Sequence, residues 1–489
     1  MADSSLRLFN SLTRELETFE PVHPGEARVY SCGPTVYNYA HIGNMRAYVF
    51  ADVLGRALSW KGYKLTHVIN ITDVGHLTDD ADAGEDKLEK AAAEAGRIGR
   101  AQSIWDIARR YTEAFWADIK ALNIREPSEW TIATKFVPQM IDFAQSIAQR
   151  HCYELESGLY FDTSSVADYG RLARAATGDG EGRIEAVEGK RNAADFAIWR
   201  KTPPGERRQM EWDSPWGRGA PGWHLECSVM SGKLLGFPFD IHTGGIDHRE
   251  IHHPNEIAQN QAFCCTNGLN QPENSGAKLW MHNNFLVERS GKMSKSSGEI
   301  LRLQLLIDRG YHPLAYRLMC LQAHYRSELE FSWEGLGAAL TRLKRLVLQV
   351  EKLRAAAADG QSQAVHPALA PLIERFDGAI GDDLNTPVAL TALEEALALK
   401  KVGAAAIRVA VAEMDAVLGL GLLELRRAAL RIRPAGATLD ETHVEDELAR
   451  RKAARAAKDF ASSDAIRDAL AENGVEVMDG DPLGWEWKL

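Results

Sequence analysis

The sequence lacks any long apolar run, and this absence argues against a membrane-spanning segment. No stretch approaches the ~20 consecutive apolar residues that a transmembrane helix needs. The first twenty residues are polar and carry acidic side chains, unlike the apolar centre of an export signal. Internal repeats and low-complexity tracts are also missing. We therefore expect a cytoplasmic globular protein with no membrane partner.

Cysteine is scarce, with six residues in a chain of 489. Six thiols in this length do not make a disulfide framework. Without an export signal we expect them to be free thiols or metal ligands in a reducing compartment. They stand at positions 32, 152, 227, 264, 265 and 320.

An excess of positive charge is also missing, since the formal net charge is −11. This balance argues against a protein that binds polyanions in general. Basic residues nevertheless cluster in 342–354 and 450–458. Each cluster is either a solvated helix face or a local surface for a folded nucleic acid, and both alternatives stay open.

The N-terminal part carries the pattern of a parallel α/β unit. Residues 27–32 form a short apolar run, 45–60 carry apolar side chains at helical spacing, and 64–72 are rich in β-branched residues. This order predicts a β-α-β unit with parallel strands. The ligand crevice of such a sheet lies at the carboxyl ends of its strands, where Cys32 and Thr72 stand.

The length predicts about three domains. The later segments are mostly helical. We expect a helical stretch at 84–122, a surface insertion with short strands at 176–209, a strand at 237–242, helices from 311 onward, linkers at 355–367 and 432–437, and a tail with a helix, a strand and two tryptophans.

The stretch KMSKS contains two lysines, Lys292 and Lys295, three residues apart. Two ammonium groups at this spacing, beside small hydroxyl side chains, can close over a polyphosphate and neutralise its charge. Alone, the same pentapeptide could be any solvated loop.

A second element of the phosphate-binding type is His41-Ile-Gly43-Asn44, which precedes the predicted helix. The N–H groups and the positive dipole end of a helix N-terminus suit a phosphate. Gly43 allows a base or ribose to approach the backbone. The alternative is that His41 only caps a loop.

Cys32, Cys227, His252 and Glu256 make a possible metal set. His252 and Glu256 share one helical face if a helix begins near His252, where Pro254 would stand in the first turn. Two thiolates, an imidazole and a carboxylate suit tetrahedral Zn²⁺. The dispersed spacing is a weak signal, and ordinary buried side chains are the alternative.

Taken together, these residues resemble the cysteinyl-tRNA synthetases of class I. The stretches that carry the resemblance are CGPTVYNYAHIGN, VINITDV, KRNAADFAIWR, SPWGRGAPGWHLECSVMS, HTGGIDH, HHPNEIAQNQA, LWMHNNFLVERSGKMSKSSG, DDLNTPVAL and KDFASSDAIRDALAENGVEVMDG. They follow the family's order from the first strand to the C-terminus. One departure is Asn44, which stands where the family's first motif usually ends in a second histidine.

The resemblance implies an α/β fold, with a Rossmann-like parallel-sheet catalytic domain that contains an inserted connective subdomain. A helical bundle and a small α+β anticodon-binding domain would follow. The implied boundaries are 1–122 and 236–310 for the two catalytic halves, 123–235 for the insertion, 311–350 for a helical region that contacts the tRNA stem, 351–431 for the bundle and 432–489 for the anticodon-binding domain.

The resemblance also implies the reaction and the partners. L-cysteine is activated with ATP to cysteinyl-adenylate, and the cysteinyl group passes to the terminal adenosine of tRNA(Cys). One Zn²⁺ per subunit would select the cysteine thiolate, Mg²⁺ would accompany ATP, and a monomer is expected. The zinc ligands would be Cys32, Cys227, His252 and Glu256.

Further roles follow from the matching positions. Thr72 and Trp223 would line the cysteine pocket, with a strand-end hydrogen bond and core packing as their alternatives. His41, Lys292 and Lys295 would be catalytic. Gly43, Asn44, Gly244, Gly245, Asp247 and Lys295 would bind ATP. Trp485 is the candidate for stacking on a tRNA base, and closing a small core is its alternative.

Two other functions stay open at this point. A ligase of the same fold could join cysteine to the amine of a small sugar-derived acceptor, but such relatives lack the tail found here. A non-catalytic, zinc-bearing RNA-binding protein would have no need for the two lysines of KMSKS.

Overall fold

The computed structural model describes residues 5–74, 90, 103–173, 188–266, 268–288, 291–292, 301–356, 366–481 and 483–489. Parts of several predicted segments lie outside these residues. They are 84–89 and 91–102 of the expected helical stretch 84–122, 176–187 of the expected insertion 176–209, 357–365 of the expected linker 355–367, and Lys295. None of the described helices is long and apolar enough to cross a membrane.

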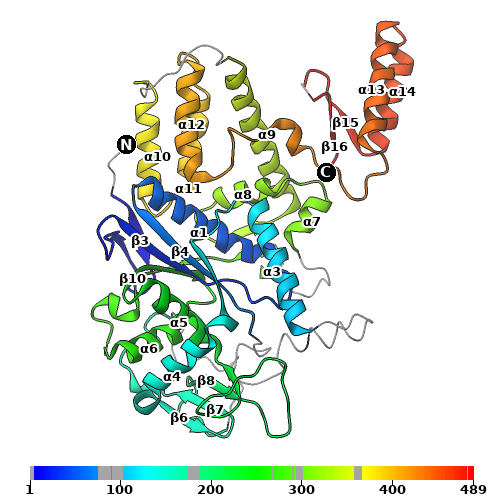
Figure 1. The fold of residues 1–489 in the computed structure, drawn as a ribbon. Coiled ribbons are helices and arrows are strands. Elements are labelled where there is room, and N and C mark those ends of the chain that lie inside the picture. Colours follow the sequence, from blue (N-terminus) through cyan, green and yellow to red (C-terminus); the bar gives the residue numbers. More distant parts are fainter. Residues whose placement is uncertain are drawn as a thin grey trace.

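A five-stranded parallel sheet forms the centre of the catalytic part (Figure 1), and its strand order is β11-β10-β3-β4-β5. The helix between β3 and β4 is α1, so the predicted β-α-β unit is confirmed. The bounds are β3 Glu26–Ser31, α1 Ile42–Trp60, β4 Lys64–Ile71, β5 Glu129–Ile132, β10 Phe239–Gly245 and β11 Ala277–Asn283.

Alternate residues of the strands enter two separate cores on the two faces of the sheet. Val29 and Ile69 pack with α1 and the helical bundle, whereas Tyr30 and Val68 pack with the helices of the opposite face. This period of two is what a sheet covered on both faces requires. Figure 1 shows α1 on one side of the sheet and α5 and α6 on the other.

The insertion contains a four-stranded antiparallel sheet of order β6-β7-β8-β9. In the sequence, this sheet lies between the helices α4 and α5. The bounds are α4 Val137–His151, β6 Cys152–Leu155, β7 Gly158–Phe161, β8 Phe196–Lys201, β9 Gly219–Pro221 and α5 Trp223–Leu235. The expected boundary at residue 123 needs correction, because β5 (129–132) pairs with β4 in the central sheet.

The remaining elements of the catalytic part lie around the central sheet. The hairpin of β1 and β2 contacts β11, while α6 follows β10, and a three-stranded sheet of order β13-β12-β14 follows β11. The bounds are β1 Arg7–Asn10, β2 Glu15–Thr18, α3 Ile104–Ala121, α6 His252–Cys264, β12 Leu286–Glu288, β13 Gly291–Lys292 and β14 Leu329–Phe331.

From residue 311 onward the described chain is mainly helical, as expected, and one further helix, α7, precedes this region. The helices α8, α9, α11 and α12 share one continuous core with α1. The bounds are α7 Leu303–Asp308, α8 Pro313–Leu321, α9 Trp333–Ala356, α10 Ala370–Gly381, α11 Thr386–Leu397 and α12 Ala404–Leu418.

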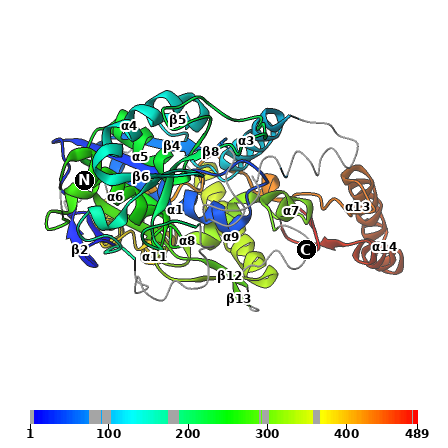
Figure 2. The ribbon, with the colours of Figure 1, turned by 90° about the horizontal axis from the view of Figure 1, so that it is seen from below.

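The tail forms a small unit with its own core (Figure 2). Two helices pack against a two-stranded antiparallel sheet. Glu486 in this sheet forms ion pairs with Lys344 on α9 and with Arg427, which attach the tail to the bundle. The bounds are α13 Glu441–Ala456, α14 Phe460–Glu472, β15 Val475–Val477 and β16 Trp485–Trp487.

Candidate functional site

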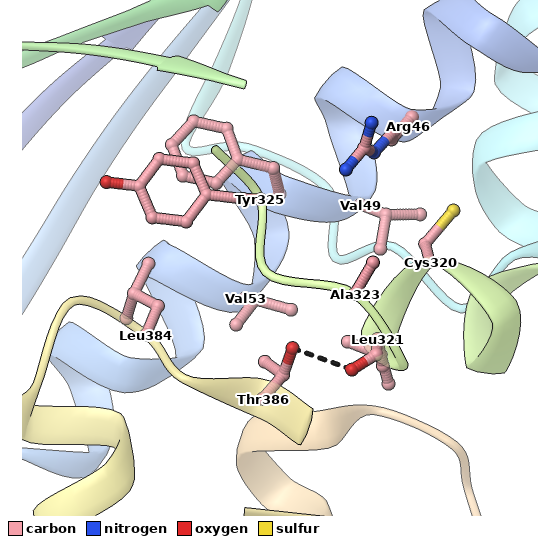
Figure 3. Close-up of a pocket in the computed structure, with 10 residues that line it drawn as sticks. Arg46, Val49, Val53, Cys320, Leu321, Ala323, Tyr325, Leu384 and Thr386 are labelled. Atoms are coloured by element: carbon pink, nitrogen blue, oxygen red, sulfur yellow. Dashed lines mark hydrogen bonds between the residues drawn. The ribbon is translucent and has the colours of Figure 1, made fainter. Parts of the chain in front are cut away.

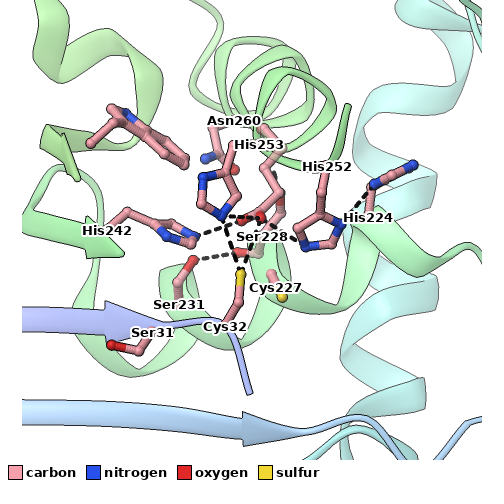
Figure 4. A network of polar contacts seen from close by, with 12 residues as sticks. Ser31, Cys32, His224, Cys227, Ser228, Ser231, His242, His252, His253 and Asn260 are labelled. Carbon is pink, nitrogen blue, oxygen red and sulfur yellow. Dashed lines mark hydrogen bonds and ion pairs between the residues drawn. The ribbon is translucent and has the colours of Figure 1, made fainter. Parts of the chain in front are cut away.

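The four predicted metal ligands converge at the carboxyl edge of the sheet (Figure 4). Figure 4 shows Cys32, which follows β3, together with Cys227 of α5 and His252 of α6. Glu256 also lies on α6. One ligand atom from each lies within 4.8 Å of the others. Cys227, His252 and Glu256 are buried, whereas Cys32 is partly exposed. Segments nearly 200 residues apart in the sequence therefore build one cluster of donors.

The local structure of α6 brings its two ligands together. The helix begins at His252, so Pro254 stands in the first turn, where its missing N–H would have had no helical partner. The Nε2 atom of His252 lies 3.0 Å from Oε1 of Glu256, as their spacing of four residues predicts.

Two further histidines orient these ligands. Nδ1 of His224 lies 2.9 Å from Nδ1 of His252, and Nε2 of His242 lies 2.9 Å from Oε2 of Glu256. Partners of this kind fix the ring and carboxylate of metal ligands. All four residues are buried, so their orientations are tightly constrained.

His253 belongs to a second possible set of metal ligands that overlaps the first. Its Nε2 atom lies 3.2 Å from Sγ of Cys32, and its Nδ1 atom lies 2.8 Å from Nε2 of His282. Cys32, His242, His253 and Glu256 form a second possible donor set within 4.8 Å. Sequence reasoning missed His224, His242 and His253, because their irregular spacing gives no local signal.

The ionisation of the buried groups follows from their neighbours. Burial opposes the charged form of Glu256, but His242 and His252 lower its pKa to about 2. Burial likewise opposes a charged His252, but the Glu256 carboxylate raises its pKa to about 10. A hydrogen bond from Cys32 lowers the pKa of the Cys227 thiol to about 7. Burial raises the pKa of the Cys32 thiol.

This donor set fits Zn²⁺. Two sulfur donors, one imidazole and one carboxylate match the ligand types and the number that zinc takes in proteins. Glu256 is ionised, and Cys227 is a thiol with a lowered pKa, so two donors reach the ligating form readily. Trp223 lies directly against the set, with its ring centroid 4.4 Å from that of His252.

Thr72 stands at the end of β4, beside the metal set. Its hydroxyl donates to Oε2 of Glu226 (2.9 Å) and accepts from the side-chain amide of Asn70 (2.9 Å). Burial raises the pKa of Glu226 to about 8. The strand-end hydrogen bond that was the alternative for Thr72 is therefore present, and it lies within the crevice.

His41 caps the N-terminus of α1. Its Nδ1 atom accepts from the Asn44 N–H (3.2 Å), and the Asn44 side-chain oxygen accepts from the His41 N–H (3.2 Å). Asn44 thus completes a capping box, which gives this unusual residue a structural role. A neutral His41 with Nδ1 as acceptor carries its proton on Nε2, which can donate to a phosphate.

Three glycines beside the crevice make room for side chains. A Cβ on Gly43 would lie 2.9 Å from Nδ1 of His41, and a Cβ on Gly244 would lie 2.7 Å from the His253 ring. A Cβ on Gly245 would collide with the Asp247 carboxylate. Gly244 and Gly245, the two expected ATP-binding glycines at the end of β10, therefore leave no room for a Cβ, because the His253 ring and the Asp247 carboxylate approach their backbone closely.

Lys292 lies on β13, where its backbone pairs with Val287 of β12. Its side chain and Lys295 lie outside the described residues. The segments that lead into β12 and β14 of the three-stranded sheet are bound by Arg46, a buried residue of α1 that sequence reasoning missed. Its guanidinium donates to the carbonyls of Asn284, Phe285, His324 and Ser327, which precede β12 and β14.

Trp485 is placed in the core of the tail, which corrects the expectation that it is available to a base. The residue is 2% exposed, packs edge-on against Trp487, and carries the Arg431 guanidinium 3.8 Å from its ring centre. The exposed aromatic of the tail is Phe460, the first residue of α14, which is 62% exposed.

A small cavity of about 30 Å³ lies on the other side of α1, between α1, α8 and residues 384–386 (Figure 3). This volume suffices for a water molecule and is too small for an amino acid or a nucleotide. This cavity is therefore not a binding site for either substrate.

Comparison with known proteins agrees with this geometry. Residues 18–341 match the family model described as the tRNA synthetases class I (C) catalytic domain. A cysteine--tRNA ligase of Novosphingobium aromaticivorans is 77% identical, with 99% of this chain and 97% of that protein covered. A cysteine--tRNA ligase of Zymomonas mobilis is 55% identical, with 98% and 97% covered.

Solved structures share the fold at low sequence identity. A leucyl-tRNA synthetase from Agrobacterium radiobacter, solved with tRNA and LeuAMS, has a TM-score of 0.57 at 12% identity and covers 85% of this chain and 87% of its own. A Mycobacterium tuberculosis methionyl-tRNA synthetase with methionyl-adenylate has a TM-score of 0.51 at 15% identity, with 80% and 89% covered.

Proposed function

Because this chain belongs to the class I cysteinyl-tRNA synthetases, we propose that Cys32, Cys227, His252 and Glu256 hold one Zn²⁺ ion that selects the substrate thiol. The enzyme itself is a cysteine--tRNA ligase, which activates L-cysteine with ATP and charges tRNA. The observation that carries the proposal is the convergence of the four donor atoms within 4.8 Å at the carboxyl edge of the sheet.

The proposed metal explains discrimination against serine and alanine. Zinc favours a thiolate over a hydroxyl and has no bond to offer a methyl group, so selection does not depend on the size of the pocket. A difference in size alone provides only ~1–3 kcal/mol. Trp223, against His252, would close one side of the pocket, and Thr72 would face it from the end of β4.

In the first step, the carboxylate of cysteine attacks the α-phosphorus of ATP, and pyrophosphate leaves with the electrons of the bridging bond. We assign a phosphate contact to Nε2–H of His41 and to the N-terminus of α1. Asp247 would bind ribose hydroxyls. Lys292 and Lys295 would neutralise the charge that moves to pyrophosphate, with Mg²⁺ bound to ATP.

In the second step, a hydroxyl of the terminal adenosine of tRNA(Cys) attacks the carbonyl of the adenylate, and AMP leaves. The tail would hold the anticodon end of the tRNA. Phe460 is its exposed aromatic, and Arg455 and Lys458 stand just before it in the sequence, so stacking and phosphate contacts can combine there.

The test is a pair of variants in cysteine-dependent exchange of pyrophosphate into ATP. Cys227→Ser should lose zinc and cysteine affinity together. Lys295→Ala should keep both but slow adenylate formation. Full zinc content in Cys227→Ser would remove that residue from the ligand set, and normal exchange in Lys295→Ala would remove the lysine from the chemistry.

A further inference from the structure

Two arginines from distant parts of the chain converge on Tyr39, two residues before the His41 cap. Nη2 of Arg110, on α3, donates to the Tyr39 hydroxyl at 3.0 Å. The guanidinium carbon of Arg302, just before α7, lies 4.6 Å from the centre of the Tyr39 ring, and that of Arg110 lies 5.6 Å away. Two guanidinium groups thus lie next to the ring and the hydroxyl of the same tyrosine.

This group is anchored beside the N-terminus of α1. The N–H of Ile42, the first residue of α1, donates to the carbonyl of Leu301, the neighbour of Arg302 (2.8 Å). On the other side, Tyr111 of α3 packs edge-on against Tyr39, with ring centres 4.9 Å apart. The two guanidinium groups are therefore held at the border of the crevice, next to the proposed phosphate site of α1.

Neither arginine forms an ion pair with a carboxylate among the described residues. Within the described part of the chain, neither has a carboxylate oxygen at ion-pair distance, whereas the neighbouring Arg109 is paired with Asp106 at 2.6 Å. Among the described residues, Asp118 interacts electrostatically with Arg302: burial raises the pKa of Asp118 to about 6, and Arg302 opposes this shift. Among the described residues, no carboxylate thus forms an ion pair with either guanidinium of the pair.

We infer that Arg110, Arg302 and the Tyr39 hydroxyl form a binding site for a substrate phosphate group, and we assign it to the acceptor end of the tRNA. Guanidinium groups bind phosphate oxygens through paired N–H donors, and a phenol adds one more donor. The pair is half-buried, so both groups keep access to a ligand.

The position favours tRNA over ATP as the source of the phosphate. In both views, α3 and α7 lie on the side of the catalytic part that faces the tail (Figures 1 and 2). A nucleic acid that contacts the tail and places its last nucleotide in the crevice must pass this side. The assignment to tRNA rests on the proposed role of the tail, whereas the phosphate chemistry of the site does not.

The experiment uses Arg110→Met, Arg302→Met and the double variant, with Arg109→Met as the matched control on the same helix. We expect each single variant to raise the KM for tRNA in charging by about fivefold to tenfold. The slope of log affinity against log salt should fall by about one for each arginine removed. Pyrophosphate exchange should stay within about twofold of wild type, and Arg109→Met should behave like wild type throughout.

The other outcomes are equally distinct. A raised KM for ATP in exchange, with the KM for tRNA unchanged, would keep the phosphate site and assign it to ATP. Unchanged values for both substrates in a double variant that melts like wild type would overturn the inference. If the wild-type enzyme itself failed to charge tRNA, the proposed function would fail instead, so the two failures are separable.

Discussion

The imidazoles of His224 and His252 face each other through their Nδ1 atoms, 2.9 Å apart. One of the two must donate the proton, and this contact turns Nε2 of His252 toward Glu256 and the thiols. His224 is buried on α5, and Phe196 packs edge-on against its ring with the ring centres 5.4 Å apart, so the ring cannot turn freely. The orientation of a ligand is thus set by a residue that belongs to neither possible donor set.

The first prediction concerns this contact. His224→Phe keeps an aromatic ring in place but removes the nitrogen that orients His252. Loss of such a partner lowers metal affinity by about tenfold to a hundredfold. We expect a decrease of this size in competition with a zinc chelator, with the exposed His366→Phe as control. Equal zinc affinity in the two variants would show that His252 needs no orienting partner.

A second prediction concerns Arg46, whose guanidinium holds four carbonyls at the base of the sheet that contains Lys292. Arg46→Met removes a buried guanidinium and leaves these partly buried carbonyls without their donor, and we expect the free energy of unfolding to fall by about 3 kcal/mol. Pyrophosphate exchange should slow by about tenfold to a hundredfold, with an unchanged KM for cysteine, because the sheet loses its register with α1.

The control for Arg46 is Arg109→Met, which removes an exposed guanidinium. A variant of Arg46 that is less stable but exchanges pyrophosphate at the wild-type rate would limit this residue to a structural role.

The third prediction is a pH dependence at Asp52, a buried residue of α1. Burial opposes its charge, but the guanidinium groups of Arg317 and Arg56 lower its pKa below the ordinary value. Arg317 donates to Asp52 Oδ2 at 2.6 Å and to the carbonyl of Leu418, so the pair joins α1 to the bundle. Asp52→Asn breaks a buried pair and should cost about 3 kcal/mol at pH 7.

The sign follows from the lowered pKa. The contribution of Asp52 is complete above its unfolded pKa of about 4, and it is lost as the pH falls through the lower folded value. The difference in stability between wild type and Asp52→Asn should therefore be constant from pH 7 to pH 5 and shrink below pH 4. Denaturant unfolding across this range would measure it, and a difference that grows on acidification would contradict the argument.

The fourth prediction separates two aromatic residues of the tail. Phe460→Ala removes an exposed ring and should weaken tRNA binding by about tenfold, since stacking contributes ~1–3 kcal/mol per base. Trp485→Ala should instead lower the melting temperature of the tail, because its ring fills the small core. Binding of tRNA and thermal unfolding of both variants would be compared. The assignment is wrong if Trp485→Ala melts normally and loses tRNA.

The predictable parts of the fold are those in which the side-chain pattern along a short segment indicates a helix or a strand. Residues 45–60 repeat apolar side chains at helical spacing, and 64–72 are β-branched, so α1 and β4 could be placed. The sheet order could not be placed, because β10 pairs with β3 across more than 200 residues of sequence, a contact that leaves no local pattern. Residues 129–132 fell within the expected insertion of 123–235, because their pairing with β4 as strand β5 leaves no local pattern either.

The candidate site also contains residues that the sequence could identify and residues that only the packing of the fold reveals. Cys32, Cys227, His252 and Glu256 were named because they stand in stretches that resemble the family, whereas their spacing alone was weak. The orienting role of His224 depends on the packing of α5 against α6, which one sequence does not reveal. Trp485 was chosen as an aromatic beside basic residues, and only the packing of the tail distinguishes its buried ring from that of Phe460.

The most direct test of the account is zinc-edge X-ray absorption of the purified enzyme with and without L-cysteine, together with metal analysis. We predict one zinc ion per chain, bound by two sulfur atoms from Cys32 and Cys227 and by lighter atoms from His252 and Glu256. Addition of cysteine should raise the number of sulfur ligands to three, and serine should leave it at two. An enzyme that activates cysteine without zinc, or with an unchanged sulfur count, would contradict the claim that the metal selects the substrate.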